Sequence, residues 1–222
     1  PRGGIGAQWR PSPAFDASAT FGYADARSNV SANLRYTPSP LTNVFLTYRE
    51  GVDTAARVLV DSLTLIEIDR RSGDLINSET GILFDRFLRG TGRRSTVTQF
   101  IRRARGGART EQGNNIFEIG GEYYSEEPTN DEEGGEEDGY TIAAGWQRAF
   151  STQTRGNITA AYERTELEDR NDNIWILKTG ITHQISDNLE ARLTYGFQNR
   201  ESTTGSFDFT ENVLTIGAIA RF

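Results

Sequence analysis

Apolar and polar side chains alternate with a period of two along most of this chain, and this pattern limits the possible folds more than any other feature. The last segment illustrates it, because every second residue before Phe222, back to Leu214, is apolar. The residues between them are mostly smaller or more polar. A period of two places the two sets on opposite faces of a β-strand. The sequence therefore predicts an all-β chain whose strands have one apolar and one polar face.

Turn-forming residues separate the alternating segments. Pro, Ser, Asp or Asn occur at residues 11–13, 37–41, 151–154 and 186–188, and the strand after each turn ends in Tyr or Phe. Such residues preset φ or hydrogen-bond to their own backbone, so they fix hairpin connections. At this spacing of turn signals we expect about 11 strands. They cover residues 4–10, 14–23, 29–37, 42–51, 79–89, 95–105, 139–150, 154–165, 173–185, 188–199 and 208–222.

The connections between these strands alternate in length. Short turns are expected near 11–13, 37–41, 90–94, 151–154 and 186–188, and longer polar loops near 24–28, 52–78, 106–138, 166–172 and 199–207. Two stretches inside the long loops, Arg57–Asp69 and Asn115–Ser125, also alternate, so each is either a strand of the main sheet or a hairpin within a loop. We interpret both as loop hairpins. The chain is expected to form one domain, residues 1–222, with its long loops near 52–78 and 106–138.

Composition narrows the class of protein. No run of 18 or more apolar residues is present, which excludes a transmembrane helix. A low mean hydropathy of −0.57 does not exclude a membrane location, because only alternate residues of a membrane strand face lipid. The chain has no Cys, hence no disulfide and no thiolate metal site. It begins at Pro1 without a signal peptide, so we expect further residues upstream.

The closing segment and the repeated aromatic–turn–strand–Tyr units resemble the last strand and the hairpins of Gram-negative outer-membrane β-barrels. This resemblance implies an antiparallel up-and-down transmembrane β-barrel of about 12 strands in the bacterial outer membrane. Because single-chain barrels have even strand numbers, the odd count above predicts at least one strand before Pro1. The resemblance also implies an assembly signal in the final strand, formed by Leu214, Ile216, Ala218, Ala220 and Phe222.

A narrower resemblance rests on two neighbouring segments. Tyr140–Arg148, followed by Thr154–Arg164, looks like barrel porins found beside exopolysaccharide and exosortase gene clusters. That group brings no catalytic or binding residues to this chain.

Charged residues on the polar face form the main candidate site. In a barrel this face lines the lumen, where opposed charges can select solutes. The same side chains could instead pair with one another and fill the lumen, as happens in small barrels. The candidates are Arg10, Asp16, Arg35, Arg49, Glu163, Lys178, Glu190 and Arg192.

Two further charged segments have both a functional and a structural explanation. A basic run could bind phosphate-rich headgroups or an anionic polysaccharide, or could simply reach water at strand ends. It comprises Arg86, Arg89, Arg93, Arg94, Arg102, Arg103, Arg105 and Arg109. The acidic segment 126–138 could bind Ca²⁺, but a solvated loop explains it more simply, so no metal site is predicted.

The residues argue against an enzyme. An outer-membrane hydrolase needs a His to activate Ser or water, and the only His, His183, is expected beside a short turn on the apolar face. No phosphate-binding glycine loop is found, so we expect no cofactor. A soluble β-sandwich would gain nothing from exposed aromatic residues at both strand ends.

The expected function is a porin-like channel, or a barrel component of an envelope transport or polysaccharide-export system. The alternative is a closed structural barrel whose extracellular loops bind a surface partner. Expected partners are outer-membrane lipid and lipopolysaccharide, the barrel assembly machinery, and an envelope or surface partner. A net charge of −7 argues against nucleic acid.

Overall fold

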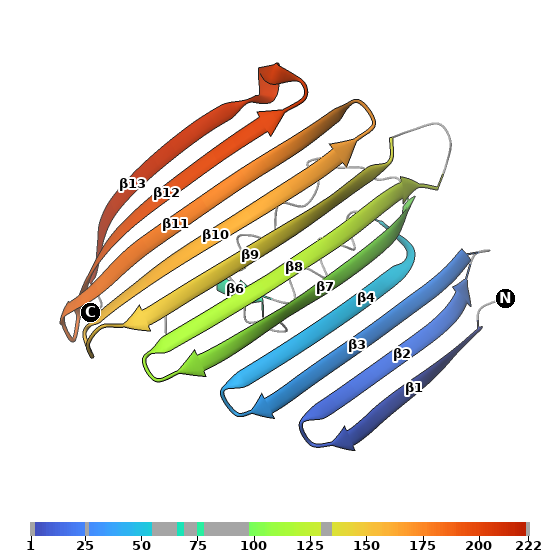
Figure 1. The fold of residues 1–222 in the computed structure, drawn as a ribbon, viewed down its shortest axis with the longest axis horizontal. Coiled ribbons are helices and arrows are strands. Elements are labelled where there is room, and N and C mark those ends of the chain that lie inside the picture. Colours follow the sequence, from blue (N-terminus) through green and yellow to red (C-terminus); the bar gives the residue numbers. More distant parts are fainter. Residues whose placement is uncertain are drawn as a thin grey trace.

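A single antiparallel sheet dominates the structure. The computed structural model describes residues 3–24, 27–54, 66–68, 75–77, 98–129 and 135–220. Its main sheet has eleven strands in the order of the sequence (Figure 1). They are β1 (Gly3–Ser12), β2 (Phe15–Ala24), β3 (Arg27–Ser39), β4 (Thr42–Thr54), β7 (Thr98–Gln112), β8 (Asn115–Pro128), β9 (Glu137–Ala149), β10 (Thr154–Leu167), β11 (Arg170–Ser186), β12 (Leu189–Ser202) and β13 (Phe209–Ala220).

Two small elements lie outside this sheet. β5 (Ile66–Ile68) and β6 (Leu75–Asn77) pair with each other in a separate two-stranded sheet. The 3-10 helix η2 (Gly205–Phe207) lies between β12 and β13. Among the described residues, no helix is long and apolar enough to cross a membrane.

Every strand of the main sheet pairs antiparallel with its neighbours in sequence, which makes the sheet up-and-down. The strands therefore connect at two ends. The turn end holds the connections at residues 13–14, 40–41, 113–114, 150–153 and 187–188. The loop end is the opposite end of the strands, and its described connections include residues 168–169 and 203–208. We use these two names below.

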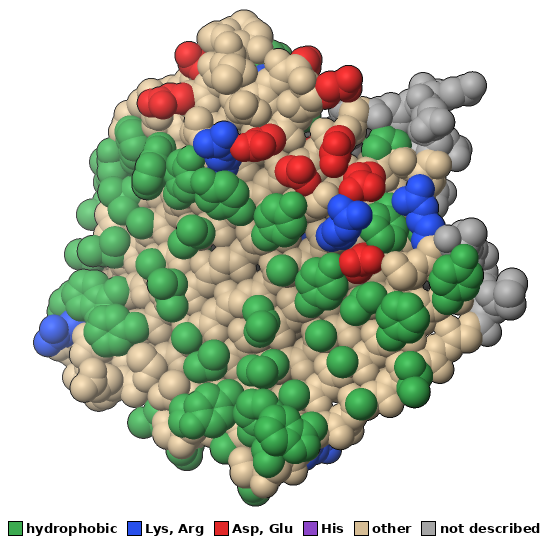
Figure 2. Space-filling model, turned by 45° about the vertical axis from the view of Figure 1, so that its right-hand side comes forward, with side chains coloured by type: hydrophobic (Ala, Val, Ile, Leu, Met, Phe, Trp, Pro, Cys, Tyr) green, Lys and Arg blue, Asp and Glu red, His purple; other side chains and the backbone are tan. Residues whose placement is uncertain are grey.

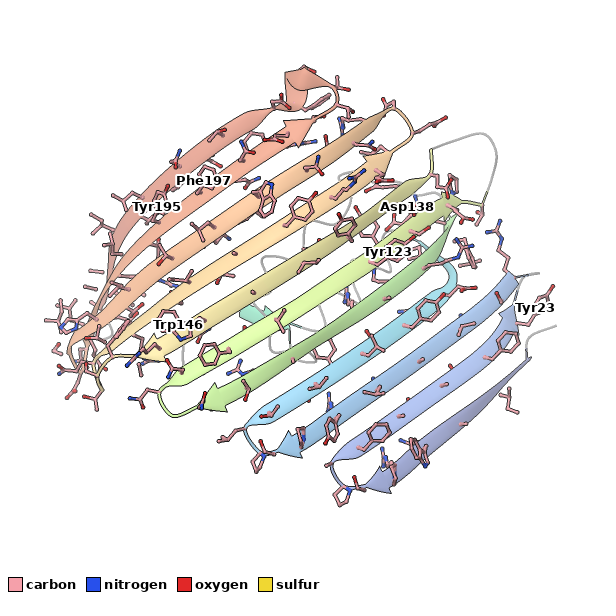
Figure 3. The ribbon with its side chains drawn as sticks, in the orientation of Figure 1. Tyr23, Tyr123, Asp138, Trp146, Tyr195 and Phe197 are labelled. Carbon is pink, nitrogen blue, oxygen red and sulfur yellow. The ribbon has the colours of Figure 1, made fainter. Side chains whose placement is uncertain are left out.

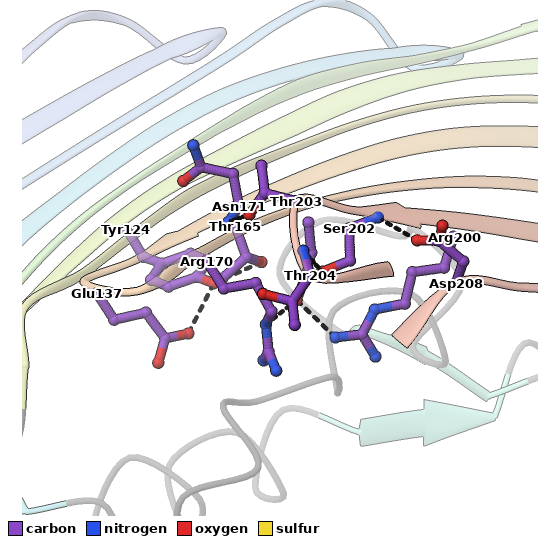
Figure 4. A network of polar contacts seen from close by, with 11 residues as sticks. Tyr124, Glu137, Thr165, Arg170, Asn171, Arg200, Ser202, Thr203, Thr204 and Asp208 are labelled. Atoms are coloured by element: carbon purple, nitrogen blue, oxygen red, sulfur yellow. Dashed lines mark hydrogen bonds and ion pairs between the residues drawn. The ribbon is translucent and has the colours of Figure 1, made fainter. Parts of the chain in front are cut away.

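The pairing register separates apolar from polar side chains. Ile142 lies opposite Tyr162, and Tyr162 lies opposite Trp175, so the apolar sets of β9, β10 and β11 share one face. Glu163 lies opposite Thr141 on the other face. A shift of one residue would exchange the two faces, so the hydrophobic pattern itself fixes this register. Figure 2 shows hydrophobic side chains spread over the apolar face, and Figure 4 shows polar side chains on the concave side of the curved sheet.

The apolar, convex face is exposed rather than packed. Ile119, Ile142 and Ile181 on three of the central strands have 56%, 54% and 50% of their surface exposed. Among the described residues, no large side chain is fully buried. A soluble protein rarely leaves a continuous apolar face of this size uncovered, so the sheet has the design of a wall between lipid and a polar compartment.

The sheet has two open edges in the described part of the chain. β1 and β13 lie at opposite edges, and their described residues do not pair with each other. All residues of both strands are exposed, on both faces. The expected all-β up-and-down fold is confirmed, with eleven sheet strands among the described residues against about 11 expected within the chain, whereas pairing of β1 with β13 to close a barrel is not seen among these residues.

One predicted loop is wrong. The segment 106–138 was expected to be a long loop, and Asn115–Ser125 a hairpin within it, but β7 continues to Gln112 and β8 is a full strand between β7 and β9. The tight turn at residues 113–114 makes this possible, since Gly113 has φ = 59°, a left-handed value that glycine adopts at little cost.

Other boundaries shift less. The strands beside the loops expected near 24–28, 166–172 and 199–207 run longer than expected. β2 ends at Ala24 and β3 begins at Arg27, and the other two loops become residues 168–169 and 203–208. The end of the stretch Arg57–Asp69 falls in β5, outside the main sheet, in line with a loop hairpin. The expected strand 79–89 and turn 90–94 lie outside the described residues.

Candidate functional site

All the charged residues proposed for the lumen fall on the concave face. Asp16 lies opposite Arg35, Arg49 opposite Arg103, Glu163 opposite Thr141 and Lys178 opposite Thr159, while Arg192 and Glu190 lie opposite Thr182 and Gln184. Arg10 reaches the same face, where its Nη2 lies 2.7 Å from Oδ2 of Asp16. The structure brings Arg10, Asp16 and Arg35 together but spreads the others along the wall. Their role in selecting solutes stays a prediction.

An arginine–glutamate ladder on β7 and β8 is the densest cluster of charge on this face. Nε of Arg103 and Nε of Arg105 lie 3.0 Å and 2.9 Å from the two carboxylate oxygens of Glu122. Four residues nearer the turn end on β7, Nη1 of Arg109 lies 2.7 Å from Oε1 of Glu118. Both glutamate side chains are less than one-tenth exposed, at 9% and 8%. These charges pair within the wall and do not project singly from it.

Sequence reasoning missed this ladder. It placed Arg102, Arg103, Arg105 and Arg109 at a strand end, whereas they lie inside β7. Of these, Arg102 faces the convex side, and its Nη1 contacts Oε1 of Glu127 at 2.5 Å. The signal was present, because Arg103, Arg105 and Arg109 are separated by two or four residues, and Glu118 and Glu122 by four, which places each set on one face of its strand. The remaining members of the basic run, Arg86, Arg89, Arg93 and Arg94, lie outside the described residues.

A second polar network occupies the concave face at the loop end, and we call it the mouth network (Figure 4). The Tyr124 hydroxyl on β8 donates to Oε1 of Glu137 at 3.1 Å and lies 3.2 Å from Oγ1 of Thr165. Thr165 on β10 lies opposite Asp172 of β11. Nη2 of Arg200 donates to Oδ2 of Asp172 at 2.5 Å, and Nε of Arg170 lies 3.0 Å from the same oxygen.

The loop between β12 and β13 is tied to this network. The backbone N–H of Ser202 donates to Oδ1 of Asp208 at 2.6 Å. Asn171 and Thr203 exchange two bonds, since Asn171 N–H donates to Oγ1 of Thr203 and Thr203 N–H donates to the Asn171 carbonyl, both at 2.9 Å. These contacts hold the loop against the ends of β11 and β12. Phe207 belongs to this loop, so its ring is held there as well.

Aromatic side chains mark both ends of the convex face. Near the turn end, the rings of Trp9 and Phe15 are 5.1 Å apart, and near the loop end those of Tyr162 and Trp175 are 4.5 Å apart. Figure 3 shows Tyr23 and Tyr123 toward the loop end and Trp146 toward the turn end. A row of charged side chains follows beyond the apolar region at the loop end (Figure 2). This order matches the aromatic girdles and polar borders of membrane barrels.

The predicted assembly signal falls partly within the described residues. Leu214, Ile216, Ala218 and Ala220 pair with Tyr195, Leu193, Ala191 and Leu189 of β12, which places them on the convex face of β13. Phe222 lies outside the described residues. Their role in assembly stays a prediction.

The described residues contain no group of three or more His, Asp or Glu side chains placed to hold a metal ion. Of the acidic segment 126–138, residues 126–128 belong to β8 and residues 137–138 to β9, while residues 130–134 lie outside the described part. His183 lies at the turn end, where its Nδ1 is 2.9 Å from Oγ1 of Thr154.

Comparison with known proteins gives the fold and little else. No protein-family model and no curated protein matches the chain. The structure is similar to a loop L8 deletion mutant of OmpT, an outer membrane protein of Vibrio cholerae, with a TM-score of 0.53 and 11% identity over 98% of this chain. It is also similar to OmpT expressed in the outer membrane, with a TM-score of 0.51 and 11% identity over 98% of this chain. A weaker likeness, with a TM-score of 0.49 and 11% identity over 99% of this chain, is to an anion-selective porin from Comamonas acidovorans.

The chain spans less than two thirds of the length of these proteins, covering 62%, 64% and 59% of them. Its fold is that of an outer-membrane β-barrel protein. The outer-membrane setting of the neighbours agrees with the location expected from the sequence. The narrower resemblance to porins of exopolysaccharide loci gains no support from these comparisons.

Proposed function

We propose that the sheet is the wall of a porin-like channel in the bacterial outer membrane. The observation that carries the proposal is the separation of side chains by face, with an exposed apolar convex surface and a charged concave surface on the same strands. In this arrangement lipid solvates the convex face and water fills the space on the concave side. Transport through it is passive.

The dimensions of the convex face support this reading. Phe15 and Tyr23 mark the aromatic ends of β2, and at about 3.3 Å per residue they lie roughly 26 Å apart along the strand. A strand tilt of about 40° reduces this to roughly 20 Å along the membrane normal, close to the apolar band of about 25 Å in membrane barrels. The charged row beyond the loop-end aromatics then lies at the level of the lipid headgroups, which makes lipopolysaccharide the proposed lipid neighbour.

The concave face supports an aqueous path. Its central charges are paired along the wall, as in the ladder of Arg103, Arg105 and Glu122, so they do not need partners across the lumen. Charges fixed on such a wall set up a field that favours some ions over others. Assembly by the barrel assembly machinery, and a place in an export system, remain proposals that rest on the sequence resemblance.

Planar-bilayer recording with the whole protein tests the channel. We expect a steady current, and we expect Arg49→Glu and Lys178→Glu to shift the reversal potential in a salt gradient toward cation selectivity. Lys178→Arg keeps the charge and is the matched control. A folded protein that carries no current contradicts the proposal and favours a structural barrel whose loops bind a surface partner.

A further inference from the structure

Two arginines of the mouth network converge on one carboxylate. Arg170 and Arg200 approach the same oxygen, Oδ2 of Asp172, at 3.0 Å and 2.5 Å. A single guanidinium can satisfy a carboxylate through two parallel bonds. A second arginine at one oxygen therefore leaves guanidinium donors in excess of what Asp172 requires.

The two guanidinium groups remain accessible from the concave side. Their side chains are 21% and 22% exposed, whereas the Asp172 side chain is only 5% exposed. Figure 4 shows Arg170 and Arg200 pointing away from the sheet, side by side. The carboxylate thus lies at the wall, and the arginines lie between it and the space that the sheet partly encloses.

An aromatic ring completes the arrangement. The guanidinium carbon of Arg170 lies 4.2 Å from the ring centroid of Phe207, and that of Arg200 lies 5.6 Å from it. Stacking on an aromatic face limits the rotation of a guanidinium and keeps its donors in a fixed plane. The ring itself is 44% exposed. Arg170 and Arg200 are carried by β11 and β12, so rigid strands set their spacing.

We propose that Arg170, Arg200 and Phe207 form a binding subsite for the oxyanion of a small solute, a carboxylate or a phosphate, at the loop end of the concave face. The inference rests on the proposed function, because the subsite lies on the path only if the concave face lines the channel. The parallel N–H donors of a guanidinium match the spacing of carboxylate and phosphate oxygens, so they can form bidentate hydrogen bonds. A spherical ion such as chloride cannot be bound in this bidentate way. The subsite selects anions by shape as well as by charge.

Titration of the whole protein in detergent micelles tests binding without any need for current. The protein is labelled with ¹⁵N-arginine, and inorganic phosphate, acetate or chloride is added at constant ionic strength. We expect the side-chain Nε–H signals of Arg170 and Arg200 to shift in a saturable way when phosphate, acetate or both are added. Comparison of the phosphate and acetate titrations shows which oxyanion is preferred. Chloride should leave these signals nearly unchanged.

Substitutions that keep the charge separate the subsite from a simple field. Arg200→Lys removes the fork and should weaken oxyanion binding by about tenfold, the effect of losing a charge-assisted hydrogen bond. Arg170→Lys serves the same purpose if Arg200→Lys does not fold. Arg155→Lys, at the turn end of β10, is the matched control and should bind as the unmodified protein does.

Three results would overturn the subsite. These are a chloride response equal to that of phosphate and acetate, unchanged oxyanion affinity in both lysine variants, and no response of either arginine to any anion. Oxyanion binding without bilayer current would instead leave the subsite in place and contradict the channel. Bilayer current without oxyanion binding would support the channel and contradict the subsite.

Discussion

Phe45 and Gly107 form a contact on the concave face that only a glycine permits. The Phe45 side chain of β4 is 6% exposed and covers Gly107 of β7. A Cβ atom at Gly107 would lie 2.8 Å from a carbon of that ring and 2.8 Å from the Ile119 carbonyl oxygen. One of these contacts is backbone, so the strand itself would have to move.

We therefore expect Gly107→Ala to lower the free energy of unfolding by about 1–3 kcal/mol, the usual cost of overpacking. Urea unfolding from lipid vesicles, followed by tryptophan fluorescence, measures it. Gly196→Ala is the control, since a Cβ at Gly196 on β12 meets nothing within 4 Å. Equal stability of the two variants would mean that Phe45 does not pack on Gly107.

Residue-level features divide into those the sequence could reveal and those it could not. The face of each lumen candidate followed from the period of two, because alternation depends only on backbone geometry. The partners of Arg103 and Arg105 did not follow, since an ion pair across two strands depends on register, and register here depends on where the β7–β8 turn falls. The stack of Arg170 and Arg200 on Phe207 was also beyond reach, because it depends on the path of a loop.

At the scale of elements, β8 shows how a strand with a clear alternating pattern can still be assigned to a loop. Its alternation was evident, with Phe117, Ile119 and Tyr123 on one face, yet we interpreted the stretch as a hairpin within a long loop, because the short connections then fell at one end only. The charges of the arginine–glutamate ladder face the concave side, where partners on the adjacent strand neutralise them. The alternation of the strand was therefore a better guide than the expected lengths of its connections.

The same strand tests whether lipid solvates the convex face. Ile119 lies between Phe117 and Tyr123 on the convex face of β8, and Tyr123 lies toward the aromatic border of that face at the loop end. For a barrel in lipid vesicles, Ile119→Arg should destabilise the folded state by about 2–4 kcal/mol and Tyr123→Arg by only about 0–1 kcal/mol, because the cost of arginine falls with distance from the midplane. Reversible urea titration in the same vesicles gives both values. Two small and equal effects would contradict lipid contact with this face.

At the scale of the whole molecule, the directions of the strands limit how the wall can be completed. Each of the eleven strands runs antiparallel to the next, so β1 and β13 run in the same direction. To close the sheet with antiparallel pairs, an odd number of additional strands must bridge the edges formed by β1 and β13. The total is then even, as in known single-chain barrels. The convex residues Ile5 and Ile216, exposed by 76% and 78%, continue the apolar surface to both edges.

Unpaired backbone groups in the hydrocarbon layer cost several kcal/mol each, so we expect both edges to be paired when the protein is in a bilayer. Amide hydrogen exchange in lipid nanodiscs measures this directly, because a paired strand exchanges slowly. Protection of β1 and β13 should equal that of β2 and β12, which are already paired on both sides. If β1 and β13 exchange rapidly while β2 and β12 stay protected, the sheet is open in the membrane, and its concave face then lines no closed channel.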